Sequence, residues 1–287
     1  MGTGYAGYAS VFNRKIATIG QLTIRYLEGG YGIPLLYVHG LEGWGSWDSV
    51  HITFALSNHV YAPLLPGWQD GRIPSFIKSP ADYAKLMRDF LEVAGIKTAT
   101  LVGYSIGGWI ALYLAAEFPD LVERLVIVDS LGLCVGDARP AAVGKMDQEA
   151  FGEAVFARRG PVLVPHDFNP DFGGVFEDLR NSPDFKRYWR GKEILVNWIG
   201  ANLEDSELGQ VARRIKAKTL IVWGRQDGLA PCEHGRFLAD CMPQATLVLL
   251  ADAGHTPMKD KRETFQGFVH QFLSNSDAFG PDRIVEA

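Results

Sequence analysis

Residues 100–108 constrain the fold of this chain more than any other segment. They read Thr-Leu-Val-Gly-Tyr-Ser-Ile-Gly-Gly, an apolar run that ends in small residues around one serine. This pattern predicts a buried strand, a tight turn and the start of a helix. Gly103 and Gly107 flank Ser105, as a strained turn that leaves little room for side chains requires. We therefore expect the Ser105 hydroxyl to project from the sheet edge beside the free N–H groups of a helix N-terminus.

Strand and helix patterns alternate on both sides of this turn. The expected strands span residues 11–19, 22–28, 34–38, 60–65, 100–104, 124–129, 219–223 and 246–250, and the expected helices 79–94, 107–118, 231–241 and 261–273. Strands that alternate with helices pair in parallel through right-handed crossovers. The chain is thus predicted to have an α/β fold with a mostly parallel central sheet and helices on both faces.

The strand pattern is interrupted between residues 131 and 216. This stretch is rich in aromatic residues and proline, and we expect it to form a helical cap, or lid, with a closing helix over 203–216. A second helical layer without a ligand is the alternative. The predicted organisation is a core of residues 1–130 and 217–273, a cap of residues 131–216, and a weakly ordered C-terminal tail of residues 274–287.

Three candidate catalytic residues follow predicted strands. Ser105, Asp227 and His255 each lie just past a strand's carboxyl end, and a parallel sheet brings these ends to one edge. A serine hydroxyl is a weak nucleophile that needs a base, and the pKa of histidine suits that task. A carboxylate on the far ring nitrogen would fix the histidine tautomer and stabilise the imidazolium.

Four motifs together resemble the α/β-hydrolase superfamily: Gly103-Tyr104-Ser105-Ile106-Gly107, His39-Gly40, Gly224-Arg225-Gln226-Asp227 and Gly254-His255. The resemblance covers about residues 11–130 and 217–273, and no motif covers the cap. It implies that Ser105 is the nucleophile, His255 the base and Asp227 the acid. It also implies an oxyanion hole formed by the backbone N–H groups of Leu41 and Ile106. No metal and no organic cofactor is implied.

Several assignments stay open at this point. Asp129, at the end of an earlier strand, is an alternative acid, and Asp252 is a weaker one. The chain departs from the family pattern at Leu64, where many relatives carry aspartate, and at Trp68, where a small or basic residue is usual. The substrate-pocket candidates are His39, Trp44, Trp68, Tyr104 and Trp189. His39 is expected to shape the oxyanion loop and not to act as a base.

Two classes of function are compatible with these residues. The first is a serine hydrolase that cleaves an ester or a similar acyl compound through an acyl-enzyme. Carbon–carbon bond hydrolases of ring-cleavage pathways resemble the segment 223–227, but their usual aromatic residue soon after the histidine is absent. The second class is a ligand-binding receptor on a hydrolase scaffold, which turnover kinetics would distinguish.

Composition narrows the expected partners. The net charge is −5 and the basic residues are scattered, so no nucleic-acid partner is expected. The sequence shows neither a signal-peptide pattern nor an apolar run of membrane-spanning length. Three cysteines without metal-site spacing predict neither disulfides nor zinc. We expect a cytoplasmic protein that acts on a small, largely apolar substrate and does not insert into membranes, with homo-oligomer formation left open.

Overall fold

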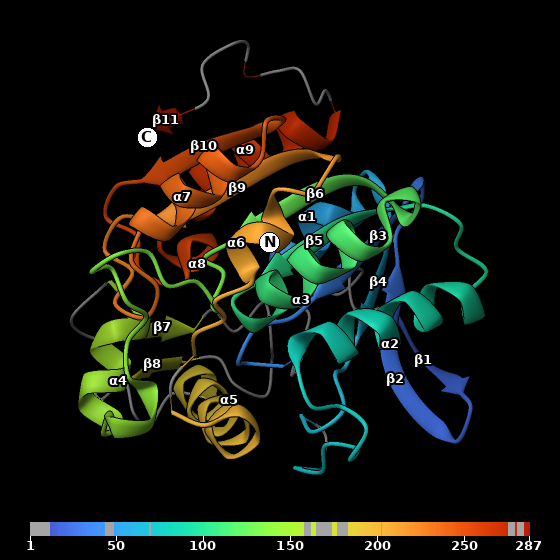
Figure 1. The fold of residues 1–287 in the computed structure, drawn as a ribbon, viewed down its shortest axis with the longest axis horizontal. Coiled ribbons are helices and arrows are strands. Elements are labelled where there is room, and N and C mark those ends of the chain that lie inside the picture. Colours follow the sequence, from blue (N-terminus) through green and yellow to red (C-terminus); the bar gives the residue numbers. More distant parts are fainter. Residues whose placement is uncertain are drawn as a thin grey trace, which may run out of the picture.

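The structure is a computed structural model that describes residues 12–43, 49–68, 70–157, 162–164, 174–176, 183–201, 203–274, 279 and 284–287. Within these residues nine strands form one sheet in the order β1-β2-β4-β3-β5-β6-β9-β10-β11 (Figure 1). The strands are β1 Phe12–Ile19, β2 Leu22–Gly29, β3 Ile33–Val38, β4 Asn58–Pro63, β5 Ala99–Tyr104, β6 Val122–Val128, β9 Lys218–Gly224, β10 Ala245–Leu250 and β11 Ile284–Glu286. From β4 to β11 all neighbours pair in parallel, whereas β1, β2 and β4 pair antiparallel.

Helices cover both faces of this sheet (Figure 1). Helices α2, α3, α6 and α7 contact one another in succession on one face, and α1 and α9 contact each other on the other. Their bounds are α1 Ser49–Ala55, α2 Pro80–Val93, α3 Ile106–Glu117, α6 Leu208–Ala212, α7 Glu233–Cys241 and α9 Arg262–Ser274. Every residue of β5 is buried, which explains its continuous apolar pattern. The predicted α/β class and the mostly parallel sheet are confirmed.

The segment between β6 and β9 does not follow the alternation of strands and helices that builds the main sheet. It contains η3 Val143–Lys145, α4 Gln148–Val155, α5 Pro183–Ile199, α6 and two short strands, β7 Val162–Val164 and β8 Gly174–Phe176. The two strands pair antiparallel in a separate sheet, although the sequence predicted no strand here. A strand of three residues is too short to show a hydrophobic period. Figure 1 shows α4, α5, β7 and β8 together beyond the carboxyl ends of the main sheet's central strands.

Two further expectations were wrong in detail. The closing helix expected over 203–216 is the shorter helix α6. In the C-terminal tail of residues 274–287, expected to be weakly ordered, residues Ile284–Glu286 form strand β11, which pairs in parallel with β10, and residues 275–278 and 280–283 lie outside the described residues. Glu286 forms ion pairs with Arg225 and Arg236, and the Ala287 N–H donates to Leu249 at 3.0 Å. A three-residue edge strand held by distant arginines leaves little local signal in the sequence.

Among the described residues, no helix combines the length and the apolar character that a membrane crossing needs.

Candidate active site

The turn at Ser105 has the strained backbone that the sequence predicts. Ser105 joins β5 to α3 with φ 58° and ψ −121°, a region that non-glycine residues rarely occupy. The neighbouring glycines are required by sterics. A Cβ on Gly103 would lie 2.4 Å from the Gly107 carbonyl oxygen, and one on Gly107 would lie 2.1 Å from the Val38 carbonyl oxygen. The start of α3 therefore packs directly against the end of β3.

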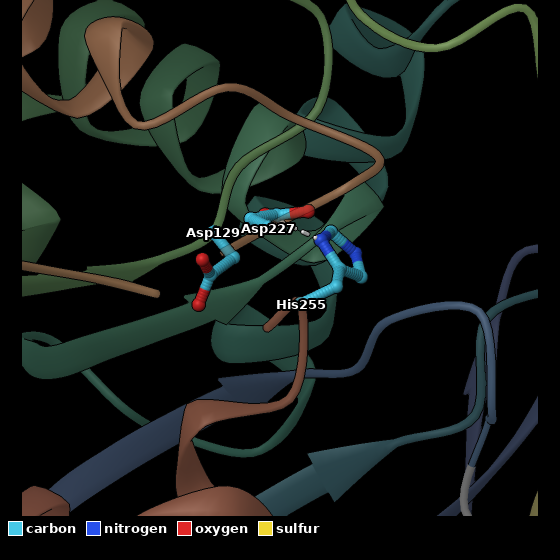
Figure 2. A group of neighbouring side chains, drawn as sticks. All are labelled: Asp129, Asp227 and His255. Carbon is cyan, nitrogen blue, oxygen red and sulfur yellow. Dashed lines mark hydrogen bonds and ion pairs between the residues drawn. The ribbon is translucent and has the colours of Figure 1, made fainter. Parts of the chain in front are cut away.

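Ser105, His255 and Asp227 are joined by hydrogen bonds at the carboxyl edge of the sheet. The Ser105 Oγ–H donates to His255 Nε2 at 2.8 Å, and His255 Nδ1–H donates to Asp227 Oδ2 at 2.8 Å. Figure 2 shows the Asp227 carboxylate directed at the imidazole ring. All three side chains are buried. The structure thus brings the three sequence-distant candidates into the relay that nucleophile activation needs.

Backbone groups hold the Asp227 carboxylate in place. Its Oδ1 accepts hydrogen bonds from the N–H groups of Leu229 at 2.8 Å and Ala230 at 3.0 Å. The other oxygen is therefore left for His255. These two hydrogen bonds fix the orientation of the carboxylate. Asp227 is positioned as the partner of His255 by its own loop.

Asp129 lies next to this pair but is held differently (Figure 2). It follows β6 with a positive φ of 41°, and its Oδ1 accepts the Gly224 N–H at 2.9 Å. Burial and the nearby charge of Asp227 raise the pKa of the Asp129 carboxyl well above its usual range. The bond from His255 goes to Asp227, so the geometry favours Asp227 over Asp129 as the acid. Asp252, the weaker alternative, instead pairs with Lys261 at 3.2 Å.

Asp129, Asp227 and His255 also have the residue types of a metal site. One ligand atom of each lies within 4.8 Å of those of the other two. However, His255 and Asp227 donate and accept a hydrogen bond between the atoms that face each other, and Ser105 occupies the remaining His255 nitrogen. The arrangement fits proton transfer, and the expectation that the site needs no metal stays a prediction.

The loop that carries His255 is braced by a residue that the sequence analysis missed. The buried Asp260 accepts the Gly254 N–H through Oδ2 at 2.9 Å. A Cβ on Gly224 would lie 2.1 Å from the Gly254 carbonyl oxygen, so the loops after β9 and β10 touch. The carboxylate of Asp260 comes from the single turn α8, Pro257–Asp260. The sequence contained a signal for this turn of helix, because Thr256-Pro257, directly after Gly254-His255, is typical of a helix N-terminus.

His39 holds the loop after β3, the expected oxyanion loop, through both of its ring nitrogens. Its Nδ1–H donates to the Gly40 carbonyl at 2.7 Å, and its Nε2 accepts the Leu65 N–H at 3.0 Å. The ring is fully buried, and desolvation lowers the pKa of His39 to about 4. Both ring nitrogens therefore bond the backbone, and a neutral His39 ties the loop after β3 to the loop after β4.

The other pocket candidates have varied surroundings. Trp68 is buried and donates from Nε1 to the Leu41 carbonyl at 2.9 Å. Tyr104 is buried, with its ring centre 5.5 Å from that of His255. Trp189, on α5, packs on Phe185 and lies 3.7 Å from the Lys192 ammonium. Trp44 lies outside the described residues.

Helices α4 and α5 contact the loops that carry the site. The Gly228 N–H, beside Asp227, donates to the Ala154 carbonyl of α4 at 3.1 Å. A Cβ on Gly191 of α5 would lie 1.7 Å from the Leu41 carbonyl oxygen. Both contacts require glycine, and neither was anticipated. A glycine inside an otherwise regular helix such as α5 was the signal of a close approach.

The turn at Ser105 has its own link to α5. The buried hydroxyl groups of Tyr104 and Tyr188 lie 3.2 Å apart and share a hydrogen bond. Tyr104 directly precedes Ser105, so the pair joins α5 to the turn itself. Tyr188 was also missed, because nothing local distinguishes it from the other aromatic residues of residues 131–216.

Comparisons with known proteins identify the family to which the chain belongs. A family model described as alpha/beta hydrolase fold matches residues 33–261, and the chain belongs to this family. An uncharacterized protein of Mycobacterium tuberculosis is 28% identical over 266 residues, covering 86% of this chain and 77% of that protein. The 2-hydroxymuconate semialdehyde hydrolase of a Pseudomonas species is 26% identical over 280 residues, covering 88% and 90%. The crystal structure of a membrane phospholipase A matches with a TM-score of 0.73 at 22% identity, covering 92% and 86%.

Proposed function

We propose that this chain is a serine hydrolase that cleaves an ester or a similar small acyl compound through an acyl-enzyme. The observation that carries the proposal is the buried hydrogen-bonded series Ser105–His255–Asp227, with both distances at 2.8 Å. A carboxylate can only accept, so the Asp227 contact assigns the proton of a neutral His255 to Nδ1 and leaves Nε2 to accept the one that Ser105 must lose.

The reaction follows from these positions. Ser105 Oγ attacks the acyl carbon while His255 Nε2 takes the hydroxyl proton, and the resulting imidazolium is stabilised by Asp227. His255 then gives the proton to the leaving alcohol oxygen, which departs as the acyl-enzyme forms. A water molecule that loses a proton to His255 attacks the acyl-enzyme, releases the acid and restores Ser105.

The negative charge of the tetrahedral intermediate needs donors. We assign this role to the backbone N–H groups of Ile106 and Leu41. Ile106 is the first residue of α3, so its N–H has no acceptor within the helix. Leu41 follows β3, whose end packs against Gly107. In comparable enzymes one such donor contributes about 3 kcal/mol to the transition state.

Residues 131–216 are proposed to act as the cap of this site. Their contacts with the loops of Asp227 and Leu41, through Ala154 and Gly191, support this role. Aromatic side chains dominate the described part of the cap near α5, where Phe151, Phe185 and Trp189 pack together. We therefore expect a largely apolar acyl or alcohol portion in the substrate.

Carbon–carbon bond hydrolysis of a ring-cleavage product is the second candidate. It is favoured by the similarity to 2-hydroxymuconate semialdehyde hydrolase, which extends over 90% of that enzyme. The same serine, histidine and aspartate would serve it. Whether the bond broken is C–O or C–C depends on the substrate's leaving group, so both substrate classes belong in one assay.

The test is turnover of p-nitrophenyl esters of graded chain length by the wild type and by Ser105→Ala, with burst-phase sampling. We expect repeated turnover by the wild type and a loss of several orders of magnitude in Ser105→Ala. Ser130→Ala is a matched control, because Ser130 is also buried but donates to the Leu131 carbonyl at 2.9 Å.

The outcomes separate the candidates. Ester turnover supports the esterase function, and the chain length with the highest turnover reports the length of acyl chain that the pocket accommodates. Rapid cleavage of a ring-cleavage diketone, with ester turnover at least a hundredfold slower in kcat/KM, supports the second candidate. A Ser105→Ala variant as active as the wild type would overturn both.

A further inference from the structure

Helix α5 and the Trp68 side chain both pack against the carbonyl oxygen of Leu41. On one side the backbone of α5 approaches so closely that a Cβ on Gly191 would lie 1.7 Å from this oxygen. On the other side the Trp68 indole donates to it from Nε1 at 2.9 Å. Leu41 is only 1% exposed and Trp68 only 7%. A buried carbonyl without a donor is costly, so the indole N–H stabilises this conformation of the loop.

Two consecutive peptide planes of the loop are thereby fixed. The peptide that joins Gly40 to Leu41 is held at its carbonyl by His39 Nδ1–H at 2.7 Å. The next peptide, which begins with the Leu41 carbonyl, is held by Trp68. Because each peptide is planar, fixing both carbonyls fixes the torsions of Leu41 between them. The Leu41 N–H lies in the first of these peptides, antiparallel to the Gly40 carbonyl, so His39 sets its direction. Trp68 fixes the second peptide and, through the torsions of Leu41, keeps the first plane from turning.

Both fixing groups depend on the loop after β4. Its Leu65 N–H donates to His39 Nε2 at 3.0 Å, and its Leu65 carbonyl accepts the Trp68 N–H at 3.1 Å. Gly67 has φ 98°, and a Cβ there would lie 2.6 Å from Ile73 Cγ1. This tight turn delivers the Trp68 indole to the loop after β3, and the ring centres of His39 and Trp68 lie 5.3 Å apart.

From this arrangement we propose that Trp68 is a positioning residue that aims the Leu41 N–H at the oxyanion of the reaction. This inference rests on the proposed function, since it gives a role to a donor of that reaction. The hydrogen bond of the Trp68 indole goes to Leu41 and not to a member of the Ser105–His255–Asp227 series. Its effect passes through the Leu41 carbonyl, so it acts where charge develops and leaves the binding of the uncharged substrate unchanged.

The experiment removes the indole donor and compares tetrahedral with ground-state binding. Trp68→Phe keeps an aromatic ring and loses Nε1–H. For each variant, kcat and KM are measured with the best p-nitrophenyl ester. Inhibition is measured with an alkyl trifluoromethyl ketone, to which Ser105 adds to give an oxyanion, and with the matching methyl ketone. Trp198→Phe is the matched control, since Trp198 Nε1 also donates to a backbone carbonyl, that of Ile77 at 3.1 Å.

We expect Trp68→Phe to lower kcat and the affinity for the trifluoromethyl ketone together, by about five- to tenfold, the equivalent of one hydrogen bond. KM, methyl ketone affinity and the pH profile of kcat/KM should change less than twofold, and Trp198→Phe should match the wild type throughout. If Trp68→Phe does not fold, single-site insertion of benzothienylalanine, which replaces the N–H by sulfur at the same shape, gives the same comparison.

Other results would overturn the inference. Unchanged trifluoromethyl ketone affinity in Trp68→Phe, with Ser105→Ala inactive, would leave the proposed function standing and remove the role of Trp68. An equal loss of affinity for both ketones, or an equal loss in Trp198→Phe, would reveal a general structural effect. A Ser105→Ala variant with wild-type turnover would overturn the proposed function and this inference with it.

Discussion

The carboxyl groups of Asp129 and Asp227 lie side by side at the ends of the neighbouring strands β6 and β9, but they have different partners. Asp227 accepts the His255 Nδ1–H at 2.8 Å, whereas Asp129 accepts the Gly224 N–H at 2.9 Å. Both groups lie in the interior of the protein. Carboxylate oxygen atoms of the two groups lie within 4.8 Å of each other, and two buried carboxylates this close are unfavourable when both are ionised. Their different partners therefore decide which of the two carries the charge.

The first prediction concerns the identity of the acid. Asp227→Asn should lower kcat by about 10³- to 10⁴-fold, because an amide at this position no longer favours the tautomer that accepts the Ser105 proton. Asp129→Asn should stay within about threefold of the wild type, since its amide oxygen can still accept the Gly224 N–H. Steady-state kinetics on one ester measures both. Equal losses in the two variants would show that Asp227 is not the distinctive partner of His255.

The second prediction concerns the effect of Asp129 on stability. The pKa of this buried carboxyl is raised, so the unfolded chain releases the proton at a lower pH than the folded chain. Its contribution to stability is therefore present below about pH 3.9, the unfolded pKa, and is lost as the pH rises through the folded pKa. Asp129→Asn should have a higher Tm than the wild type at pH 8, and the difference should shrink toward pH 4.

Thermal unfolding across this range measures the difference. Asp240→Asn is the matched control, because Asp240 is exposed on α7 and should give a curve parallel to that of the wild type. A Tm difference for Asp129→Asn that does not vary with pH would contradict the assigned direction of the pKa shift.

The third prediction is a loss of stability in mild acid from His39. Its pKa falls from 6.5 to about 4 on folding, so the unfolded chain takes up a proton first as the pH decreases. The stability that neutral His39 contributes is present above pH 6.5 and is lost as the pH falls toward 4. The full loss is about 3–4 kcal/mol, since one pKa unit corresponds to about 1.4 kcal/mol.

Urea unfolding at pH 7, 5.5 and 4.5 tests this expectation. His39→Gln should be less stable than the wild type at pH 7 because it loses a backbone hydrogen bond, but its stability should fall less steeply in acid. His270→Gln, at an exposed position of α9, should follow the wild-type slope. Parallel slopes for the wild type and His39→Gln would be inconsistent with a buried neutral His39.

The sequence predicted eight of the nine described strands of the main sheet and the strand ends at which Ser105, Asp227 and His255 meet, because their signals are local. Continuous apolar runs mark strands buried on both faces, and the glycines around Ser105 reflect contacts within one turn and its neighbouring strand. Parallel pairing then brings the strand ends together without further information. The relation of Ser105, Asp227 and His255 follows from topology alone.

The features that the sequence did not reveal depend on contacts between distant segments. Nothing near Trp68 indicates that its indole meets the Leu41 carbonyl, and nothing near Tyr188 indicates the Tyr104 hydroxyl. Strand β11 and the pair β7–β8 are too short to show periodicity. Such contacts are fixed by how residues 131–216 and the C-terminus pack on the core, which local propensity does not encode.

The last prediction concerns the contact between α5 and the loop after β3. Gly191→Ala would place a Cβ 1.7 Å from the Leu41 carbonyl oxygen. The atoms nearest to this Cβ are all backbone atoms of Leu41, so no flexible side chain can move to make room. We expect a loss of about 1–3 kcal/mol in stability, with a fall in kcat as the loop or α5 shifts. Gly267→Ala is the matched control, because a Cβ on this glycine of α9 meets no atom within 4 Å. It should gain up to about 1 kcal/mol from helix propensity and keep wild-type kcat. A Gly191→Ala variant with unchanged Tm and kcat would mean that α5 does not rest on this loop in solution, and the role of residues 131–216 as a cap would lose its main support.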